Sequence, residues 1–410
     1  MRVLIHNSDS PKNRGDRAIL VGVIELVRRQ WPDAEIWSLS QYPDRDEEWF
    51  GIKFLPQSPY STNLGQWFAL LGLARRSDVV LWGGGEILKD YTNKLGLVYW
   101  WVKITAISLV NRNIIGAFQG IGPTSANISK RLITWTINRT RVFVTRDEES
   151  KQKLIDWGVK RPVISSFDPA VIGVPSVFDD TLAARVTAET GIEREFLSNA
   201  VGFGLRRWFH YKQAGWLPNK YRSEKSRATE EPSEKLVTYT ANVARLADRL
   251  VAEHDVNVVF FPMHMDASEG DDVFAEQVIE LMVHKDRTRV LAKDVFSSND
   301  YAGIMGSLRF FVASRLHSAI LATIANVPAF VLYYVDKGRL FFEQVGMQRY
   351  SDPIEATLEA DFVETHAARI TQLLGEADGV RAEQREGVAS MSIALERDFA
   401  SAAAIIEKKR

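Results

Sequence analysis

Short apolar runs alternate with amphipathic segments along most of this chain. Arg2 to His6 is such a run, and the segment from Arg17 to Gln30 that follows it carries apolar residues at helical spacing. Buried strands joined by amphipathic helices are typical of a parallel sheet that is covered on both faces. The pattern therefore predicts such a sheet up to about residue 175. The further strands expected there are Ala34–Ser38, Ser77–Trp82, Asn113–Phe118, Arg141–Thr145 and Pro162–Ser166.

The pattern stops between about residues 176 and 200, where turn formers precede a polar amphipathic segment, and it starts again at Ala200–Leu205. We place a domain boundary here. The prediction is an α/β protein with two doubly wound, Rossmann-like domains that face each other across a cleft. The domains are expected over residues 1–178 and 195–375, followed by a C-terminal helix over 376–410. The other strands expected in the second domain are Val256–Phe261, Arg289–Leu291, Phe310–Ala313 and Ala329–Tyr334.

The predicted strands of the first half end in glycine or in charged residues. In an open α/β sheet these ends share one edge, and ligands bind in the crevice beside it. Glycine lets backbone approach a ligand closely, although a run such as Gly83–Gly85 is as often a tight turn. No G-x-G-x-x-G follows a strand and no G-x-x-x-x-G-K-[ST] occurs, so the fingerprints of dinucleotide and P-loop sites are missing. Asp147 is expected to cap a helix, and Asp168 to brace the turn before Pro169.

The segment from Phe310 to Lys337 has the strongest functional pattern. Arg315 and His317 lie where an apolar strand gives way to a helix, and a helix N-terminus favours a bound phosphate or carboxylate. The next strand ends near Lys337, so three groups that can carry positive charge reach one crevice. A lone histidine is more often a core residue, but the three groups together favour a functional site. At the end of the strand that opens this half lie Arg206, Arg207 and Trp208.

Composition excludes several classes of protein. Lys plus Arg number 51 and Asp plus Glu 52, which argues against an extended nucleic-acid surface because such a surface needs an excess of positive charge. The absence of cysteine excludes disulfides and thiolate metal sites, and makes the cytoplasm the simplest location. His264 and Asp266 could be a pair of metal ligands, but no third ligand has a suitable spacing, so no metal is expected.

No apolar run is long enough to span a membrane. The nearest candidate, Leu95 to Val110, is interrupted by Lys103 and Thr105. It is either a buried helix or one that lies against a membrane with its pair of tryptophans, and we expect burial because buried helices are the commoner cause of such runs. Residues 213–235 are charged, rich in serine and poor in apolar side chains, which predicts a mobile loop beside the cleft or a solvated insertion.

Several short motifs follow one another in a fixed order: Asn13–Ala18, Gly83–Gly85 with Asp90, Gln119–Pro123, Arg146–Asp147 with Ser150, Asp168–Ala170, Arg315–His317, and Tyr334 with Lys337. In this order and spacing the chain resembles the polysaccharide pyruvyl transferase family, from its N-terminus to about Gly346. The resemblance implies a GT-B-like enzyme that moves the pyruvyl group of phosphoenolpyruvate onto two hydroxyls of a sugar, forming a cyclic ketal and releasing phosphate. No cofactor is then expected. The functional positions of the family correspond to Asp16, Arg146, His317 and Lys337.

The implied chemistry requires positive charge for the donor, and one group each to give and to take a proton. Ketal formation protonates the methylene carbon while a sugar hydroxyl attacks its neighbour, so we expect His317 to act as the acid and Asp16, on the opposite wall, as the base. Arg146 is expected to orient Asp16 or to stabilise the departing phosphate. Guanidinium and ammonium groups bind phosphate and carboxylate. The donor-binding residues expected are Arg206, Arg207, Arg315, Ser318 and Lys337.

The acceptor is expected to bind mainly on the first domain. Glu86 and Asp90 could hydrogen-bond sugar hydroxyls, although a carboxylate at a helix start explains them equally well. Aromatic faces stack on sugar rings, and the tryptophans placed for this are Trp82, Trp208 and Trp216. The acceptor-binding residues expected are Asn13, Gly84, Gly85, Glu86, Asp90 and Trp208.

Two other functions fit the same plan. One is a nucleotide-sugar glycosyltransferase, and the other is a non-catalytic glycan-binding protein that kept the architecture. In the preferred interpretation the acceptor is a sugar of a polysaccharide, such as a cell-surface exopolysaccharide, or of its precursor. If the acceptor is lipid-linked, the enzyme would work at the inner face of the membrane, in peripheral contact with it and without crossing it.

Overall fold

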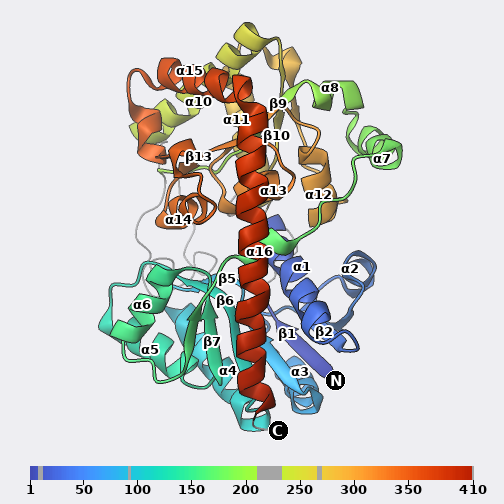
Figure 1. Cartoon of the computed structure of the whole chain (residues 1–410), viewed down its shortest axis with the longest axis vertical. Coiled ribbons are helices and arrows are strands. Elements are labelled where there is room, and N and C mark those ends of the chain that lie inside the picture. Colours follow the sequence, from blue (N-terminus) through green and yellow to red (C-terminus); the bar gives the residue numbers. More distant parts are fainter. Residues whose placement is uncertain (8–12, 91–93, 210–232, 266–269, 409–410) are drawn as a thin grey trace.

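The computed structural model describes residues 1–7, 13–90, 94–209, 233–265 and 270–408. Two sheets, each flanked by helices, lie towards opposite ends of the long axis of the molecule (Figure 1). In both sheets all neighbouring strands run parallel, as the alternation of strands and helices predicts. The predicted α/β class with two doubly wound domains is therefore confirmed.

The first sheet has the order β3-β2-β1-β4-β6-β7-β8, with β5 beside β6. The order reverses between β1 and β4, which pair from Val3 opposite Val79 to His6 opposite Trp82. The segments that follow His6 and Trp82 therefore leave the sheet at the same level, at the switch point where ligands bind in such sheets. The strands are β1 (Arg2–His6), β2 (Glu35–Ser40), β3 (Lys53–Pro56), β4 (Val79–Trp82), β5 (Gly85–Leu88), β6 (Ile114–Ile121), β7 (Val142–Thr145) and β8 (Val163–Ser165).

The second sheet has the order β11-β10-β9-β12-β13-β14 and reverses between β9 and β12. Ala313 of β12 lies opposite Gly204 of β9 and Val331 of β13. Arg206 and Arg315 consequently leave this sheet close to the same level. The strands are β9 (Ala200–Gly204), β10 (Asn257–Phe260), β11 (Thr288–Val290), β12 (Phe310–Ala313), β13 (Ala329–Tyr333) and β14 (Ser351–Pro353).

The strands predicted from apolar runs are all present, with ends that agree to within a few residues. Three observed strands lack such a run and were not predicted. β14 reads Ser-Asp-Pro, β3 ends on a proline, and β5 follows directly on two glycines. They pair with β13, β2 and β6, so tertiary context rather than local sequence makes them strands.

Helices cover both faces of each sheet (Figure 1). In the first domain α3, α4 and α5 pack on one face, while α1 and α16 pack on the other. The α-helices are α1 (Arg14–Gln30), α2 (Pro43–Phe50), α3 (Leu64–Arg76), α4 (Leu95–Val110), α5 (Asn127–Ile137), α6 (Glu148–Asp156), α7 (Asp180–Thr190), α8 (Arg194–Ser198), α10 (Glu234–His254), α11 (Asp271–Leu281), α12 (Ser298–Met305), α13 (Leu316–Ile324), α14 (Asp336–Gln344), α15 (Phe362–Gly375) and α16 (Ala377–Glu407).

Helix α4 has the predicted bounds, but the expectation that it is buried is correct for one side only. Trp100, Ile104 and Ile107 lie in the core under the sheet. On the opposite side Val102 is 43% exposed and Leu109 is 80% exposed. Because the helix is apolar on every side, the sequence did not indicate which side would face the sheet.

Helix α16 returns from the second domain to the first and runs along most of the molecule (red in Figure 1). Near its start Gln384 donates a hydrogen bond to the carbonyl of Val327 in the second domain, at 2.8 Å. Near its end Phe399 packs on Phe118 of β6, and Glu407 accepts from the indole of Trp31 at 2.9 Å. One helix thus contacts the cores of both domains.

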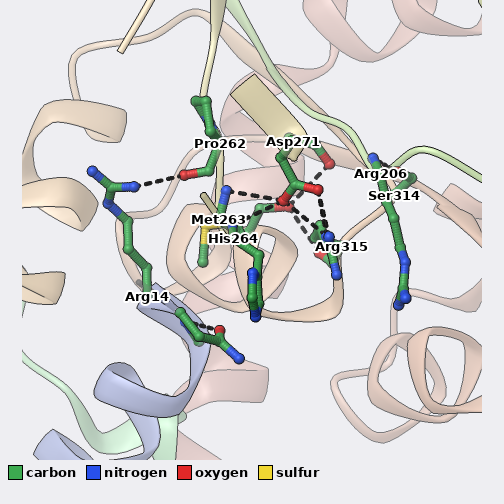
Figure 2. A network of polar contacts seen from close by, with 12 residues as sticks. Arg14, Arg206, Pro262, Met263, His264, Asp271, Ser314 and Arg315 are labelled. Atoms are coloured by element: carbon green, nitrogen blue, oxygen red, sulfur yellow. Dashed lines mark hydrogen bonds and ion pairs between the residues drawn. The ribbon is translucent and has the colours of Figure 1, made fainter. Parts of the chain in front are cut away.

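Arg14, the first residue of α1, binds the first domain to the second. Arg14 is 2% exposed, and its guanidinium donates to the backbone carbonyls of Pro262 at 2.9 Å and Lys293 at 2.6 Å (Figure 2). The backbone N–H of Arg14 donates to the carbonyl of Met263 at 2.9 Å, and the guanidinium stacks 4.3 Å above the ring of Tyr301. Charge-assisted bonds to buried carbonyls are stronger than neutral ones, so this residue joins the two domains firmly.

Substitution of Arg14 by alanine should destabilise the contact between the domains. Hydrogen bonds that involve a charged group contribute about 1.5–3 kcal/mol each, and the carbonyls would stay buried, so we expect a loss of about 3 kcal/mol in the free energy of unfolding. Urea denaturation followed by tryptophan fluorescence measures it. The matched control is Arg29→Ala on the same helix, which removes an exposed pair with Glu396 and should cost less than about 1 kcal/mol. Equal losses in the two variants would contradict the assignment.

Candidate active site

A pocket of about 360 Å³ lies between the two domains. The first domain contributes the end of β6 with the residues up to Pro123, and the start of α6. The second contributes the end of β13 and the start of α14. Both contributions come from carboxyl ends of strands, as the topology predicts. The residues that line it are Glu86, Gly120, Ile121, Gly122, Pro123, Arg146, Asp147, Glu149, Ser150, Lys153, Tyr333, Tyr334, Val335, Lys337, Leu340 and Glu355.

Lys337 is the cation of the second domain that lines this pocket. It follows β13, at the second position of α14, and its ammonium lies 5.7 Å from the ring centre of Tyr334. Across the pocket stand Lys153 and Arg146 from the first domain. Among the residues with described side chains, no carboxylate lies within 4 Å of the Lys337 ammonium. The pocket therefore presents a positive charge that an anionic ligand can neutralise.

Arg146 is the centre of a buried group of charges on the first domain. Its side chain is 5% exposed, and its guanidinium lies 3.1 Å from Glu86, 3.6 Å from Asp168 and 3.9 Å from Asp147. Gly120 makes room for it, because a Cβ atom at that position would lie 2.6 Å from the guanidinium. The carbonyl of Arg146 accepts a hydrogen bond from Gln344 of the second domain at 3.2 Å. Ion pairs, close packing against Gly120 and a backbone hydrogen bond thus fix the position of Arg146.

Glu86 lines the pocket as an ionised carboxylate. Burial alone would raise its pKa, but the positive charges of Lys337, Lys89 and Arg146 lower that pKa to about 2. A carboxylate that stays ionised at neutral pH can accept hydrogen bonds from a ligand but cannot donate a proton to it. The predicted contact of Glu86 with sugar hydroxyls would use it as an acceptor of this kind.

His317 crosses from the second domain to touch the first. It lies in the first turn of α13, is 17% exposed, and its Nε2 is 3.5 Å from the Asp168 carboxylate. On its other side lies Gly15 of α1, where an added Cβ atom would be only 2.3 Å from Nδ1. Only glycine leaves room for the imidazole at this point. Asp16 is the next residue of α1, and neither Asp16 nor His317 is among the residues that line the pocket.

Asp168 has a larger role than the sequence indicated. It accepts the backbone N–H of Ala170 at 3.1 Å and so braces the predicted turn, which continues as the short helix η1 (Pro169–Ile172). In addition it lies between His317 and Arg146. Burial alone would raise its pKa, but the hydrogen bond and charge of His317 and the charge of Arg146 lower it. A small cavity of about 10 Å³ is lined by Asp168 and by Arg146 and Lys337, which also line the pocket.

Tyr334 is a pocket residue for which the sequence predicted no chemical role. Arg206 donates to its hydroxyl at 2.5 Å and stacks 4.6 Å above its ring, and Trp208 packs against it at 4.5 Å. Burial alone would raise the pKa of Tyr334, but Arg206, Lys337 and Arg315 lower it to about 7. A phenol with this pKa can give or take a proton at neutral pH. Arg206 was predicted to bind the donor and Trp208 to bind the acceptor, and both contact Tyr334.

Arg315 faces a buried carboxylate outside the pocket. Asp271, at the start of α11, is 1% exposed and binds the guanidinium of Arg315 with both oxygens, one of them 2.9 Å from Nε (Figure 2). The same carboxylate accepts the backbone N–H groups of Met263 at 3.2 Å and His264 at 2.9 Å. Asp271 was not among the residues expected from the sequence to belong to the site. The pair lies beside the carbonyls that hold Arg14.

Other predicted ligand residues make hydrogen bonds within the protein. Ser318 is fully buried, and its hydroxyl donates to the carbonyl of Arg315 at 2.8 Å. Asn13 caps α1 through its side-chain oxygen, and Asp90 accepts from the backbone of Ser125 and Ala126. Asp147 caps α6 as predicted. These bonds stabilise the ends of elements that border the site.

The remaining candidates differ in how close they come to the pocket. Gly84 and Gly85 have left-handed φ angles of 109° and 75°, and a Cβ atom on Gly84 would lie 2.6 Å from Asn7. They serve a tight turn at the switch point. Arg207 is half-buried at the end of β9. Trp82 is fully buried in the core, so the expectation that it stacks on a sugar was wrong.

Two further expectations concern metals and membranes. Within the ranges that the structure covers, no group of three His, Asp or Glu side chains is arranged to hold a metal ion. Asp266, Trp216 and the charged segment up to residue 232 lie outside these ranges. A search of the same ranges finds no helix with the length and apolarity that crossing a membrane requires.

Comparison of the chain with known proteins identifies one protein family, and solved structures that share one fold. Residues 13–336 match the family model described as polysaccharide pyruvyl transferase. Among solved structures, Anabaena HepE in complex with UDP-glucose has a TM-score of 0.58 and 11% identity, covering 98% of this chain and all of its own. No curated protein matches the chain.

Two epimerases show the same architecture. UDP-GlcNAc 2-epimerase of Methanocaldococcus jannaschii has a TM-score of 0.54 and 10% identity over 90% of this chain and 92% of its own. A putative UDP-N-acetylglucosamine 2-epimerase of Listeria monocytogenes has a TM-score of 0.51 and 12% identity over 94% and 90%. At these identities the likeness concerns the fold alone, and it confirms the predicted GT-B-like arrangement.

The tyrosinate of Tyr334 should be visible in a pH titration. Ultraviolet absorbance should show one tyrosine that ionises near pH 7, and Tyr334→Phe should remove that step. Arg206→Gln should move it to higher pH, because one positive neighbour is lost. The pKa of Tyr334 in the folded protein lies below its value near 10 in the unfolded chain. Between about pH 7 and 10 the folded state therefore binds fewer protons than the unfolded state, and Tyr334 increases the free energy of unfolding as the pH rises.

The control for this titration is Tyr42→Phe, which changes a tyrosine that is 49% exposed. It should leave the step near pH 7 in place. A step that persists in Tyr334→Phe would show that another group ionises there.

Proposed function

The chain belongs to the polysaccharide pyruvyl transferase family and is a transferase, and from this premise we propose that it transfers the pyruvyl group of phosphoenolpyruvate to two hydroxyls of one sugar. The products are a cyclic pyruvate ketal and inorganic phosphate. The observation that carries the proposal is the pocket between the domains, in which Lys337 faces Lys153 and Arg146 beside an ionised Glu86. A small, strongly anionic donor and a hydroxyl-rich acceptor match these two kinds of group.

The donor is proposed to bind against the cations of the pocket. Phosphoenolpyruvate carries a phosphate and a carboxylate, and both prefer ammonium and guanidinium partners. Lys337 is the group with which it would pair directly. Arg146 is already surrounded by three carboxylates, so its charge would hold Glu86 and Asp168 in place and stabilise the departing phosphate. Arg206 would act on the donor indirectly, through its hydrogen bond to the hydroxyl of Tyr334.

The proton transfers are proposed to take place where α1 meets α13. His317 gives a proton to the methylene carbon, which becomes the methyl group, while Asp16 takes the proton of the attacking hydroxyl. The second hydroxyl then attacks the same carbon, and the carbon–oxygen bond to phosphate breaks. Phosphate leaves with the second hydroxyl proton, so that atoms and charges balance. Asp168 orients His317 by its contact at 3.5 Å and is itself held by Arg146.

The acceptor is proposed to be a saccharide of a polysaccharide, or its lipid-linked precursor. Glu86 is placed to accept hydrogen bonds from its hydroxyls, and Trp208 lies beside Tyr334 at the rim formed by the second domain. The decisive experiment is mass spectrometry of an acceptor glycan library after incubation with phosphoenolpyruvate. The product should gain one pyruvate less one water, with release of one phosphate. Modification by UDP-glucose instead would favour a glycosyltransferase, and binding without modification would favour a glycan-binding protein.

Neutral substitutions at two positions should abolish turnover without unfolding the chain. His317→Gln removes the proton donor and Lys337→Met removes the pocket ammonium, so we expect phosphate release to fall by about 100-fold or more in each. Lys337→Met should also raise the KM for phosphoenolpyruvate. Lys151→Met, at a partly exposed site on α6, is the control and should keep its activity. Full activity of both site variants would refute the assignment.

Gly15→Ala should impair the enzyme through His317. The added methyl group would overlap the imidazole, which must leave its present position beside Asp168, so we expect the kcat for phosphate release to drop by about tenfold or more. Gly72→Ala is the control, because the nearest atom to its added Cβ is the tip of Arg76 at 3.9 Å. Equal kcat values for the two variants would show that the imidazole does not need its present position.

A further inference from the structure

The outer surface of α3, α4 and α5 carries large apolar side chains that face solvent. The three helices pack side by side on one face of the first sheet. Their inward side chains fill the core, while the outward ones are uncovered. Exposed are Leu64 at 74%, Phe68 at 73%, Leu95 at 43%, Val102 at 43%, Leu109 at 80%, Ile128 at 43% and Trp135 at 49%.

These side chains form one stripe on each helix. On α3, Leu64 and Phe68 are one turn apart. On α4, Leu95, Val102 and Leu109 recur every seven residues, which keeps them on one side. On α5, Ile128 and Trp135 show the same spacing, and Trp135 contacts Trp101 of α4. An apolar surface of this extent on a folded protein marks an interaction site.

The sequence segments that hold these stripes contain positive charge and no negative charge. Residues 49–77 and 91–146 contain eleven lysine or arginine residues and no aspartate or glutamate, although the whole chain is nearly neutral. Two of the eleven are not at this surface, because Lys103 is buried and Arg146 belongs to the candidate site. At the carboxyl ends of the three helices lie exposed arginines that form no ion pair with the described part of the chain. They are Arg75 and Arg76 after the α3 stripe, Arg112 after α4, and Arg139 after α5, with Arg131 exposed within α5.

On other surfaces many exposed arginines pair with a carboxylate, as Arg28 does with Glu25 and Arg349 with Glu383. Cations near a helix C-terminus also interact with the helix dipole, but that effect does not explain the absence of acids over two long segments. The three helices all connect parallel strands, so their cationic ends lie along one edge.

We propose that this surface docks onto an anionic lipid bilayer. Apolar side chains in the middle of the surface, including a tryptophan, can insert among the acyl chains. Arginines at its edge can pair with negatively charged headgroups. A second copy of the chain is a poorer occupant, because a symmetric contact through this surface would set arginines against arginines. The surface binds to the bilayer from outside.

Docking in this orientation brings the pocket near the lipid surface. The stripes begin at Leu64, Leu95 and Ile128, at the helix ends on the pocket side of the sheet. Pro123, which lines the pocket, lies only a few residues before α5. A saccharide linked to a lipid in the same bilayer could therefore reach the pocket. Docking itself stands independently of the proposed function, while this delivery of the acceptor rests on it.

The experiment is co-sedimentation of the full chain with vesicles. Vesicles of phosphatidylcholine with phosphatidylglycerol should bind the protein and vesicles of phosphatidylcholine alone should bind it much less, with binding that weakens as salt is added. The double variant Phe68→Ser, Leu109→Ser should lower binding by about tenfold or more, because two exposed apolar side chains are lost. Both positions are exposed, so folding should be unaffected. The control is Val177→Ser with Ile393→Ser, at 78% and 70% exposure elsewhere.

Three results would overturn the proposal. They are no sedimentation with anionic vesicles, equal binding of the double variant and its control, or a dimer in analytical ultracentrifugation that the double variant dissociates. Phosphate release with a water-soluble acceptor should be the same in wild type and double variant. A loss of lipid binding with that activity intact therefore separates this inference from the proposed function, which fails only if no acceptor is modified.

Discussion

The contact between the start of α1 and the second domain determines the geometry of the site. Arg14 reaches into the second domain and bonds backbone carbonyls, whose positions are fixed by the fold. The next residue, Gly15, lies against His317. One helical turn therefore joins the domains and, at the same time, sets the distance between the imidazole of one domain and the carboxylates of the other. The same contact therefore attaches the domains and positions the residues of the candidate site.

Charge in the site is arranged as a buried group of paired ions next to lysines that line the pocket. In the buried group the guanidinium of Arg146 lies among the carboxylates of Glu86, Asp147 and Asp168. Lys337 and Lys153 line the space that a ligand would fill. The buried group can remain fixed while the ligand comes and goes, since its ions already have partners.

Much of this site could be predicted from the positions of strand ends. The rule that ligands bind at the carboxyl edge placed Arg146, His317 and Lys337 together, because each directly follows a buried apolar run. Contacts between side chains that are far apart in the sequence could not be predicted in the same way. Asp271 with Arg315, Arg206 with Tyr334 and Asp168 with His317 each join segments that only the tertiary fold brings together. Apolar stretches such as Leu95–Val110 likewise leave the exposed side undetermined until their neighbours are known.

The path of α16 limits how the two domains can move. The chain passes from the first domain to the second after η1 and returns through this single long helix. The chain therefore crosses between the domains at two places, and a continuous helix resists bending because each of its backbone hydrogen bonds would have to lengthen. A change in the angle between the domains would have to turn about the line that joins these two crossings, with the largest displacement on the side of the pocket farthest from α16.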